Sequence, residues 1–301
     1  MENQRPSINL SKQRDFGEIF NATFDILRTD YRFILRVLLM YAGPFLLISA
    51  ILGAYYQQNS FQMFQFKNGG VDLNMFTWVY LATILAGLVS NVMLVGTIAS
   101  YMKLYKENGA GNFAPEDVWK TVSKSFFPLF GTVVLMILMM VVPVFILLVL
   151  GALLGAVGVL FMMLVVMVFL AYLGPSVSLA FVAQVCERLN PGEAIGRSFK
   201  ITHTAWWWNF LLIIVFFLIA YLAGLIIQIP QVVMTMSSMM HGFDGGDPSN
   251  SGMVFIIVST VCTFLSSIVM SIPYFGLSIH YFSLVEKKES PSLHNKINDI
   301  R

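Results

Sequence analysis

Two small groups of residues in this chain are of the types that catalysis and metal binding use. Ser278 and His280 could serve as a nucleophile and a base, but these roles require side chains on elements that face each other. Residues two positions apart on one helix point to different faces, so we do not expect this pair to act together. His241, Asp244 and Asp247 could hold a metal, but they lie among glycines, and we interpret the segment as a flexible acidic loop. We therefore predict no enzymatic activity, no metal and no cofactor.

A third group consists of basic residues three or four positions apart, which could bind anions. Such pairs lie on one face of a helix and could bind phosphate groups. The six residues, which we call the basic collar, are Arg28, Arg32, Lys120, Lys124, Arg197 and Lys200. Each basic residue near an anionic membrane surface contributes roughly 1 kcal/mol to binding. Two interpretations remain open: the collar binds anionic lipid headgroups, or its charges only orient the protein in a membrane.

The composition places the basic collar in a membrane protein. The chain has 301 residues, of which 57% are hydrophobic and 11% charged, and its mean hydropathy is +0.75. Soluble domains are much less apolar. The net charge of +2 is too small to indicate a nucleic-acid partner. Cys186 and Cys262 lie at the end of one apolar segment and inside another, and we interpret both as packing residues.

Amphipathic helices are expected to position the collar. One begins at Asn190, with Pro191 in the first helical position and Glu193 in the third, where a carboxylate can bond back to the cap. It leads through the three tryptophans at 206–208 into an apolar segment. This pattern is typical of a helix that lies in the membrane interface before the chain crosses.

Six apolar segments are long enough to span a membrane. They cover about residues 33–56, 76–101, 127–150, 159–186, 210–229 and 253–285. No charged residue occurs between 126 and 185, a length that needs two spans, so we expect a hairpin with its turn between Gly151 and Gly158. The alternative is that Gly151 and Gly155 form a helix-packing motif.

Prolines and glycines predict where the helices bend or end. Pro44, Pro175 and Pro273 should bend the spans that contain them, because proline removes a helical hydrogen bond. The second span should stop at Gly109 and the fifth near Pro230. We expect loops at about residues 57–74 and 230–251, and a polar, disordered tail from residue 286.

The amphipathic helix is expected three times. Glu18 stands three positions after the cap Asp15, and Asp117 stands three positions after Ala114, as Glu193 does after Asn190. Each is followed by two spans, and the second span carries a helix breaker, Gly96 in the first copy. We therefore predict one all-α membrane domain over residues 1–301, with six transmembrane helices in three repeats of interfacial amphipathic helix plus helical hairpin. The repeats cover about residues 13–109, 113–189 and 190–288, and a polar tail covers 289–301.

The placement of basic residues predicts orientation. Of the 18 lysines and arginines, 17 lie before or at the start of span one, between spans two and three, between spans four and five, or after span six. Lys67 alone lies on the other side. By the positive-inside rule, both termini and all three amphipathic helices face the cytoplasm.

Two segments resemble a known family. The run Glu193-Ala-Ile-Gly-Arg-Ser-Phe-Lys-Ile-Thr202 is similar to the signature of the membrane domain attached to some bacterial glycerophosphodiester phosphodiesterases, and to related stand-alone inner-membrane proteins of unknown function. The segment from Arg14 to Phe24 looks like the start of the same domain. The resemblance implies a multi-pass protein of the bacterial inner membrane. It implies the membrane part alone, because the catalytic domain of that family is a separate soluble barrel.

Two hypotheses for the function follow. The favoured one is a non-enzymatic envelope protein that organises membrane lipid or a protein partner through its cytoplasmic collar. The rival is a transporter of a small solute or lipid, with a cavity on a pseudo-threefold axis. The residues that would line this cavity are Asn91, Thr97, Ser176, Gln184 and Ser271.

Overall fold

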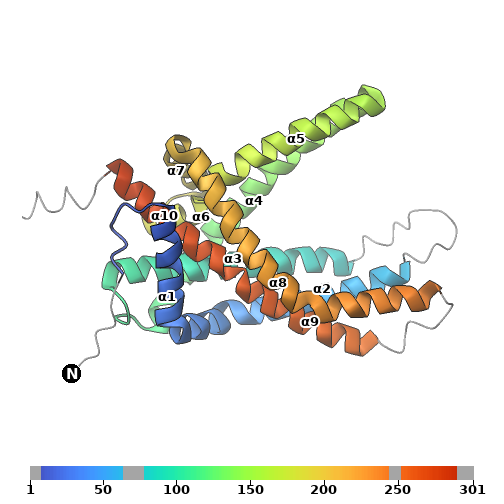
Figure 1. Cartoon of the computed structure of the whole chain (residues 1–301), viewed down its shortest axis with the longest axis horizontal. Helices are drawn as coiled ribbons and strands as arrows, with labels where there is room; N and C mark the ends of the chain where they lie inside the picture. Colours follow the sequence, from blue (N-terminus) through green and yellow to red (C-terminus); the bar gives the residue numbers. More distant parts are fainter. Residues whose placement is uncertain (1–7, 64–77, 244–251, 290–301) are drawn as a thin grey trace, which may run out of the picture.

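The computed structural model describes residues 8–63, 78–243 and 252–289, and every regular element in these ranges is a helix (Figure 1). The predicted all-α fold is confirmed for this part of the chain. The elements are α1 (Phe16–Val37), the π-helix η1 (Leu38–Ala42), α2 (Gly43–Met63), α3 (Trp78–Asn108), α4 (Pro115–Leu153), α5 (Gly155–Val177), α6 (Ala180–Glu187), α7 (Pro191–Thr202), the 3-10 helix η3 (His203–Ala205), α8 (Trp206–Phe243), α9 (Gly252–Val269) and α10 (Ser271–Glu289).

Six helical segments of the described chain are long and apolar enough to cross a membrane. They cover residues 16–58, 78–108, 115–153, 155–187, 191–237 and 252–289. Their most apolar windows have mean hydropathies between 2.0 and 3.3. By length and composition, the chain is a polytopic membrane protein.

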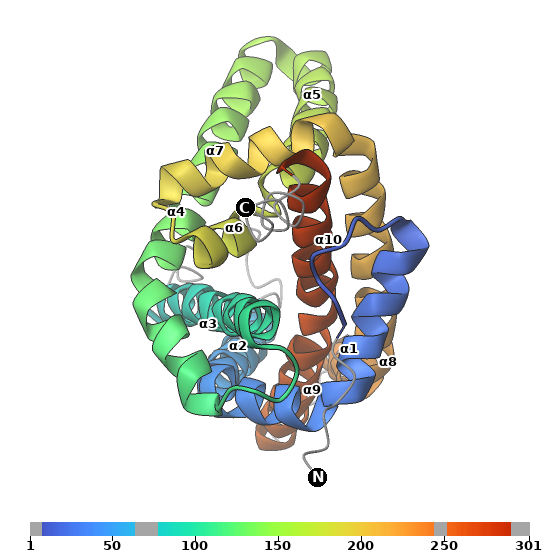
Figure 2. The same cartoon turned by 90° about the vertical axis from the view of Figure 1, so that its left-hand side faces the viewer.

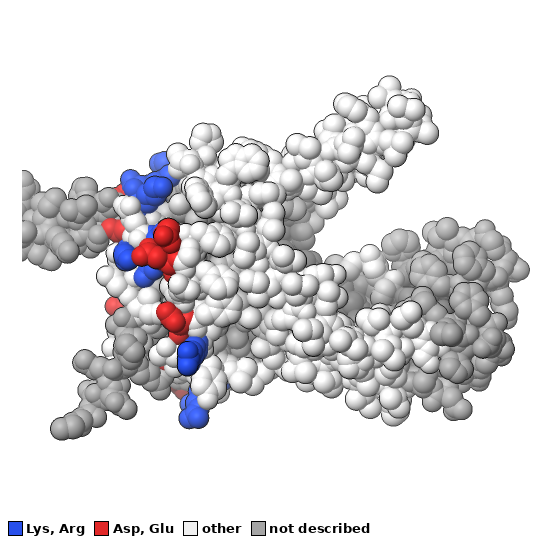
Figure 3. All heavy atoms as spheres, in the orientation of Figure 1, with Lys and Arg blue, Asp and Glu red and all other residues white. Residues whose placement is uncertain are grey.

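Three helical hairpins extend from one end of the molecule (Figure 1). α2 packs against α3 and α9, and α8 packs against α9, so two of the hairpins form one bundle. The hairpin of α4 and α5 points away from this bundle, and an open gap separates the two in the space-filling view (Figure 3). The side chains of this hairpin are therefore mostly exposed.

Charged side chains gather at the end from which the hairpins extend (Figure 3). We call this the charged end. Long parts of the described chain contain no lysine, arginine, aspartate or glutamate at all, namely residues 37–63, 78–102, 125–186, 201–243 and 252–285. Such segments suit a hydrocarbon environment, where a charged side chain is costly.

α10 lies in the middle of the charged end, among α1, α3 and α8 (Figure 2). It is buried over most of its length, and its side chains Phe275 and Tyr281 belong to one apolar cluster with Tyr101 of α3 and Phe216 of α8. Gly276 allows α10 to approach α8 closely, because a Cβ there would lie 2.6 Å from the Phe216 ring. The centre of the charged end is thus packed with apolar side chains.

The predicted starts of three helices are confirmed. In each case the third-position carboxylate accepts a hydrogen bond from the backbone N–H of the cap residue. The bonds are Asp15 to Glu18 at 3.2 Å, Ala114 to Asp117 at 3.2 Å, and Asn190 to Glu193 at 3.0 Å. At the first start, the Asp15 side chain also accepts from the Glu18 N–H at 2.7 Å.

Breaks in the helices also fall close to the predicted positions. α3 ends directly before Gly109, which has a φ of +82°. The π-helix η1 ends two residues before Pro44, the break between α5 and α6 follows Pro175, and the break between α9 and α10 lies three residues before Pro273. These positions fit the loss of a helical hydrogen bond at each proline.

The turn between α4 and α5 lies at Leu154 and Gly155, within the predicted range. Gly155 has a φ of +76°, which favours glycine. Gly151 and Gly158 serve close packing across this turn, because a Cβ on Gly158 would lie 2.7 Å from the Gly151 carbonyl oxygen. The turn interpretation is therefore correct, and two of the glycines also bring the helices together.

Three predicted ends are wrong, because the helices are longer than the apolar patterns indicate. α8 continues through Pro230, α2 continues to Met63, and α10 continues to Glu289. A single proline removes one helical hydrogen bond, which a long helix tolerates when the other backbone groups stay paired. The extended parts of α8 and α2 also bond to each other, since Gln231 Nε2 donates to Gln57 Oε1 at 2.8 Å.

Two further expectations differ from the structure. Gly96 does not break α3; a Cβ there would lie 3.0 Å from Leu129 Cδ1, so this glycine allows close packing on α4. The second amphipathic segment and the span that follows it form one unbroken helix, α4, despite Pro128. Helical hydrogen bonding continues after Pro128, so the interfacial segment does not end as a separate helix at this proline.

Candidate functional site

The basic collar is carried by α1, the first part of α4, and α7, which surround α10 when the molecule is viewed from the charged end (Figure 2). Five of its six residues are exposed there, namely Arg28, Arg32, Lys120, Lys124 and Lys200. Arg197 is the exception, because its side chain is only 17% exposed. The collar residues therefore differ in how available they are to a ligand.

Arg197 joins three helices. Its Nη2 lies 2.9 Å from Oε1 of Glu187 at the end of α6, and its Nη1 lies 2.5 Å from Oε1 of Glu289 at the end of α10. The Tyr281 hydroxyl donates to the same oxygen of Glu187. These two carboxylates already neutralise the guanidinium, so the predicted phosphate-binding role of Arg197 is not supported. Sequence analysis missed Glu289 because it assigned that residue to the tail.

Two other collar residues also have local partners. Lys120 Nζ lies 3.2 Å from Asp117 Oδ1, one helical turn earlier. The Arg32 guanidinium lies over the ring of Tyr31, 5.6 Å from its centroid. The side chains of the remaining three have no polar partner in the described ranges, and these are Arg28, Lys124 and Lys200. They are the collar cations that remain available to an external anion.

Further polar bonds hold the charged end together. Lys103 is buried, and its Nζ donates to the Val185 carbonyl of α6 at 2.9 Å. The Tyr101 hydroxyl donates to the buried carboxylate of Asp30 at 2.9 Å. Ser283 of α10 accepts from the backbone N–H of Arg14 at 2.9 Å. Sequence analysis identified none of these contacts, since each joins residues at least 71 positions apart.

The five residues predicted to line an axial cavity lie on α3, α5, α6 and α10, and no hydrogen bond joins any two of them within the described chain. Thr97, Ser176, Gln184 and Ser271 are buried, whereas Asn91 is exposed and bonds to Tyr274. Gln184 Oε1 accepts from Thr132 at 2.8 Å, and Ser176 Oγ donates to the Tyr172 carbonyl at 2.9 Å. The five residues are thus not linked into one hydrogen-bonded network in the described chain.

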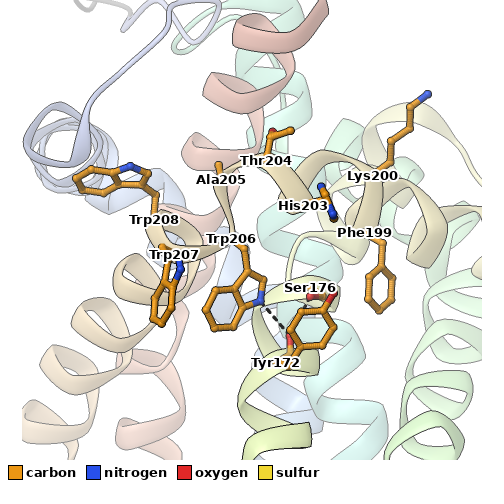
Figure 4. Close-up of a pocket in the computed structure, with 10 residues that line it drawn as sticks. All are labelled: Tyr172, Ser176, Phe199, Lys200, His203, Thr204, Ala205, Trp206, Trp207 and Trp208. Carbon is orange, nitrogen blue, oxygen red and sulfur yellow. Dashed lines mark hydrogen bonds between the residues drawn. The ribbon is translucent and has the colours of Figure 1, made fainter.

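A pocket of about 760 Å³ lies between α5, α7, η3 and the start of α8 (Figure 4). Its lining residues are Tyr172, Ser176, Phe199, Lys200, His203, Thr204, Ala205, Trp206, Trp207 and Trp208. It lies where α5 and α8 begin to diverge (Figure 1). Sequence analysis identified the tryptophans as interface residues and Lys200 as a collar residue. It did not predict a pocket, because α5 precedes α8 by about thirty positions.

The break after Pro175 builds one wall of this pocket. It leaves backbone carbonyls at the end of α5 without helical partners, and side chains of later helices donate to them. Asn209 Nδ2 donates to the Pro175 carbonyl at 2.6 Å, and Ser198 Oγ donates to the Ser176 carbonyl at 2.7 Å. Trp206 Nε1 donates to the Tyr172 carbonyl at 3.2 Å. The end of α5 is therefore attached to α7 and α8.

Of the residues considered for catalysis and metal binding, Ser278 and His280 have side chains within the described chain. The Ser278 hydroxyl donates to the Tyr274 carbonyl of its own helix at 2.7 Å and not to His280. Asp244, Asp247 and the His241 side chain lie outside the described residues, and the ranges that were described contain no group of three potential metal ligands. Comparison with known protein families, curated proteins and solved structures found no match for this chain.

Proposed function

We propose that this chain is a non-enzymatic protein of the bacterial inner membrane that organises anionic lipid, or a protein partner, through its basic collar. The observation that carries the proposal is the location of the charges. They gather at one end of a long apolar body (Figure 3), and three exposed collar cations have no partner in the described chain. By the positive-inside rule, we assign this end and both termini to the cytoplasm.

We also propose that the molecule consists of three repeats. Counted from the third-position acids Glu18, Asp117 and Glu193, the residues one, five, twelve, sixteen and nineteen positions later are buried in every copy. These residues are Ile19, Val118 and Ala194; Thr23, Val122 and Ser198; Asp30, Leu129 and Ala205; Ile34, Val133 and Asn209; and Val37, Met136 and Leu212. Agreement at these five positions, in an alignment without a gap, supports a common unit.

A helical irregularity in the first and third proposed repeats, and a proline in the second, occur at the same position of the repeat. Asp30 has non-helical angles (φ −113°, ψ 18°), Pro128 lies inside α4, and the 3-10 helix His203–Ala205 separates α7 from α8. All lie ten to twelve positions after the acid. This is where an interfacial segment would turn into a span, which supports equivalent roles for the three collar segments.

We further propose that the chain is a counterpart of the membrane domain of glycerophosphodiester phosphodiesterases. The resembling run from Glu193 to Thr202 forms α7 and ends there, so the similar residues make up one collar element. Ser198 and Thr202 are fully buried within it, while Lys200 is exposed. Since two of its polar residues are buried, we favour a structural role for this motif in the collar over a catalytic role.

A transporter of a small solute or lipid is the alternative. One observation favours it: the Thr97 hydroxyl and the Gln184 Nε2 are buried and have no hydrogen-bond partner in the described chain. Water or a polar solute could satisfy such groups. The apolar packing around α10 favours the first proposal instead. Reaction of a Thr97→Cys variant with a small, membrane-impermeant thiol reagent would favour transport; protection from the reagent on both sides would favour the collar function.

The collar function is tested by neutralising the three cations without partners, with Arg28→Gln, Lys124→Gln and Lys200→Gln in one variant. At roughly 1 kcal/mol each, their loss should weaken binding of anionic lipid on the order of a hundredfold. The measurement is the phospholipid retained by the purified protein, together with its topology from reporter fusions.

The matched control keeps the charges, with Arg28→Lys, Lys124→Arg and Lys200→Arg. It should retain lipid as the original protein does. Reduced retention with unchanged topology in the neutral variant supports the proposal. Unchanged lipid retention in that variant would show that the collar charges only orient the protein.

A further inference from the structure

We propose that the pocket at the divergence of α5 and α8 binds one anionic phospholipid, with its phosphate at Lys200 and His203 and its acyl chains between the two helices. The inference rests on the proposed lipid function of the collar and gives it a specific location. Four observations carry it: the direction of the side chains, the charge of the rim, the rigidity of the wall, and the apolar gap beyond the pocket.

The side chains of the pocket are arranged as an amphiphile requires. Phe199, Trp206 and Trp207 point to the side on which α5 and α8 extend, whereas Lys200 points the opposite way (Figure 4). Tryptophan rings prefer the level of the lipid headgroups, and lysine extends its ammonium toward the polar layer. A phospholipid in this pocket would therefore place its phosphate beside Lys200 and its chains along the aromatic rings.

The rim of the pocket suits an anion. No aspartate or glutamate lines it. Glu193 of α7 accepts a hydrogen bond from the Asn190 N–H, and Glu187 and Glu289 are both engaged by Arg197. A second cation lies beside the first, because Lys288 Nζ donates to the backbone carbonyl of Lys200 at 2.6 Å. A phosphate at this rim would therefore meet positive charge without a competing carboxylate.

The aromatic wall is held in place before any ligand binds. Trp206 stacks on Tyr172 at 5.9 Å and on Phe210 at 5.2 Å between ring centroids. Its indole N–H donates to the Tyr172 carbonyl, and Asn209 holds the Pro175 carbonyl. Because these side chains are already fixed, they lose little conformational entropy when a ligand binds. The volume of about 760 Å³ lies in the range of roughly 300–1,000 Å³ that is usual for ligand pockets.

The gap beyond the pocket suits acyl chains. α5 and α8 separate as they leave α7 (Figure 1), and neither helix contains a lysine, arginine, aspartate or glutamate. Exposed side chains along both are large and apolar, for example Leu164 and Val168 on α5 and Leu211 and Leu218 on α8. Lipid chains are the natural occupant of such a surface in a membrane.

The test uses the full chain in detergent and the quenching of its tryptophan fluorescence by brominated phospholipids. Trp78→Phe, Trp119→Phe and Trp208→Phe leave Trp206 and Trp207 as the reporters. Brominated phosphatidylglycerol should quench them at lower concentration than brominated phosphatidylcholine. Lys200→Gln should weaken this preference about fivefold, and Lys200→Arg should restore it.

The matched control is Lys124→Gln, which removes an exposed collar cation from a residue that does not line the pocket. It should leave the preference unchanged. Equal quenching by the two lipids, or equal effects of Lys200→Gln and Lys124→Gln, would overturn the specific site and indicate ordinary boundary lipid.

The outcomes also separate this inference from the collar function. Loss of lipid retention in the triple neutral variant, with no effect of Lys200→Gln on quenching, would overturn the pocket and leave the collar. Unchanged lipid retention in the triple variant, with a lost preference in Lys200→Gln, would overturn the collar as a whole and leave the pocket.

Discussion

Arg197 is the residue on which the ends of α6, α7 and α10 converge. A guanidinium presents several N–H donors in a fixed plane and can therefore serve two carboxylates at once. Here it serves Glu187 at the end of α6 and Glu289 at the end of α10. We infer that Arg197 stabilises the charged end and does not bind a ligand.

Arg197→Met should lower the stability of the protein by about 1 kcal/mol, because it removes the cation that two partly exposed carboxylates share. The effect is measured as a lower midpoint of thermal unfolding in detergent. Lys124→Met, which removes an exposed cation without a partner in the described ranges, should change the midpoint little. Equal midpoints for the two variants would contradict the structural role of Arg197.

Gly276 is a second residue whose type is dictated by packing. Gly276→Ala should destabilise the protein by about 1–3 kcal/mol, because the new methyl group would overlap the Phe216 ring. The matched control is Gly224→Ala on α8, where a Cβ would meet nothing within 4 Å. We expect the control to be as stable as the original protein or slightly more stable. A thermal midpoint for Gly276→Ala as high as that of the control would show that α10 and α8 are not in close contact.

At the scale of elements, the break between α5 and α6 is held by two side-chain donors, one from α8 and one from the break itself. The Pro175 carbonyl accepts from Asn209 Nδ2 at 2.6 Å and from Ser178 Oγ at 2.9 Å. A backbone carbonyl without a partner is costly in an apolar environment. Packing of α8 beside the break therefore helps to stabilise it.

A double-mutant cycle tests this dependence. Asn209→Leu and Ser178→Ala should each lower stability by about 1 kcal/mol, since one donor to the carbonyl remains in each case. The double variant should lose more than the sum, because the carbonyl then has no side-chain donor. Thermal unfolding of the four proteins measures the coupling, and strict additivity would argue against the shared role.

At the scale of the whole molecule, the α4–α5 hairpin determines the overall shape. It leaves the bundle of the other two hairpins and exposes large apolar side chains along its length (Figure 1). In water such a surface would cause aggregation. In a membrane it is solvated by lipid, so the open shape itself requires a bilayer.

The transmembrane topology of the whole chain can be tested with reporter fusions. Reporter fusions after Glu107, Arg188 and Arg301 should report the cytoplasm, and fusions near Asn68 and Gly246 should report the outer side. The reason is the separation of basic residues, since 17 of 18 are expected on one side. A cytoplasmic signal near Gly246 would contradict a hairpin of α8 and α9 that crosses the membrane twice.

Sequence alone determined the features that depend on neighbours along the chain. The helix starts at Asp15, Ala114 and Asn190 follow from contacts between residues three positions apart. The turn at Gly155 follows from an apolar run too long for one span, and from a residue that tolerates positive φ. The number of apolar helices follows in the same way from length and hydropathy.

Only the tertiary structure decided which polar groups are free and which are engaged. Arg197 and Lys200 look alike in the sequence, yet one lies between two carboxylates and the other remains exposed, because Glu289 approaches from 92 positions away. The pocket beside Trp206 likewise needs α5 and α8 to meet at one end and then separate. Contacts between distant segments depend on how whole helices pack, and local patterns of residue type and spacing carry no information about that packing.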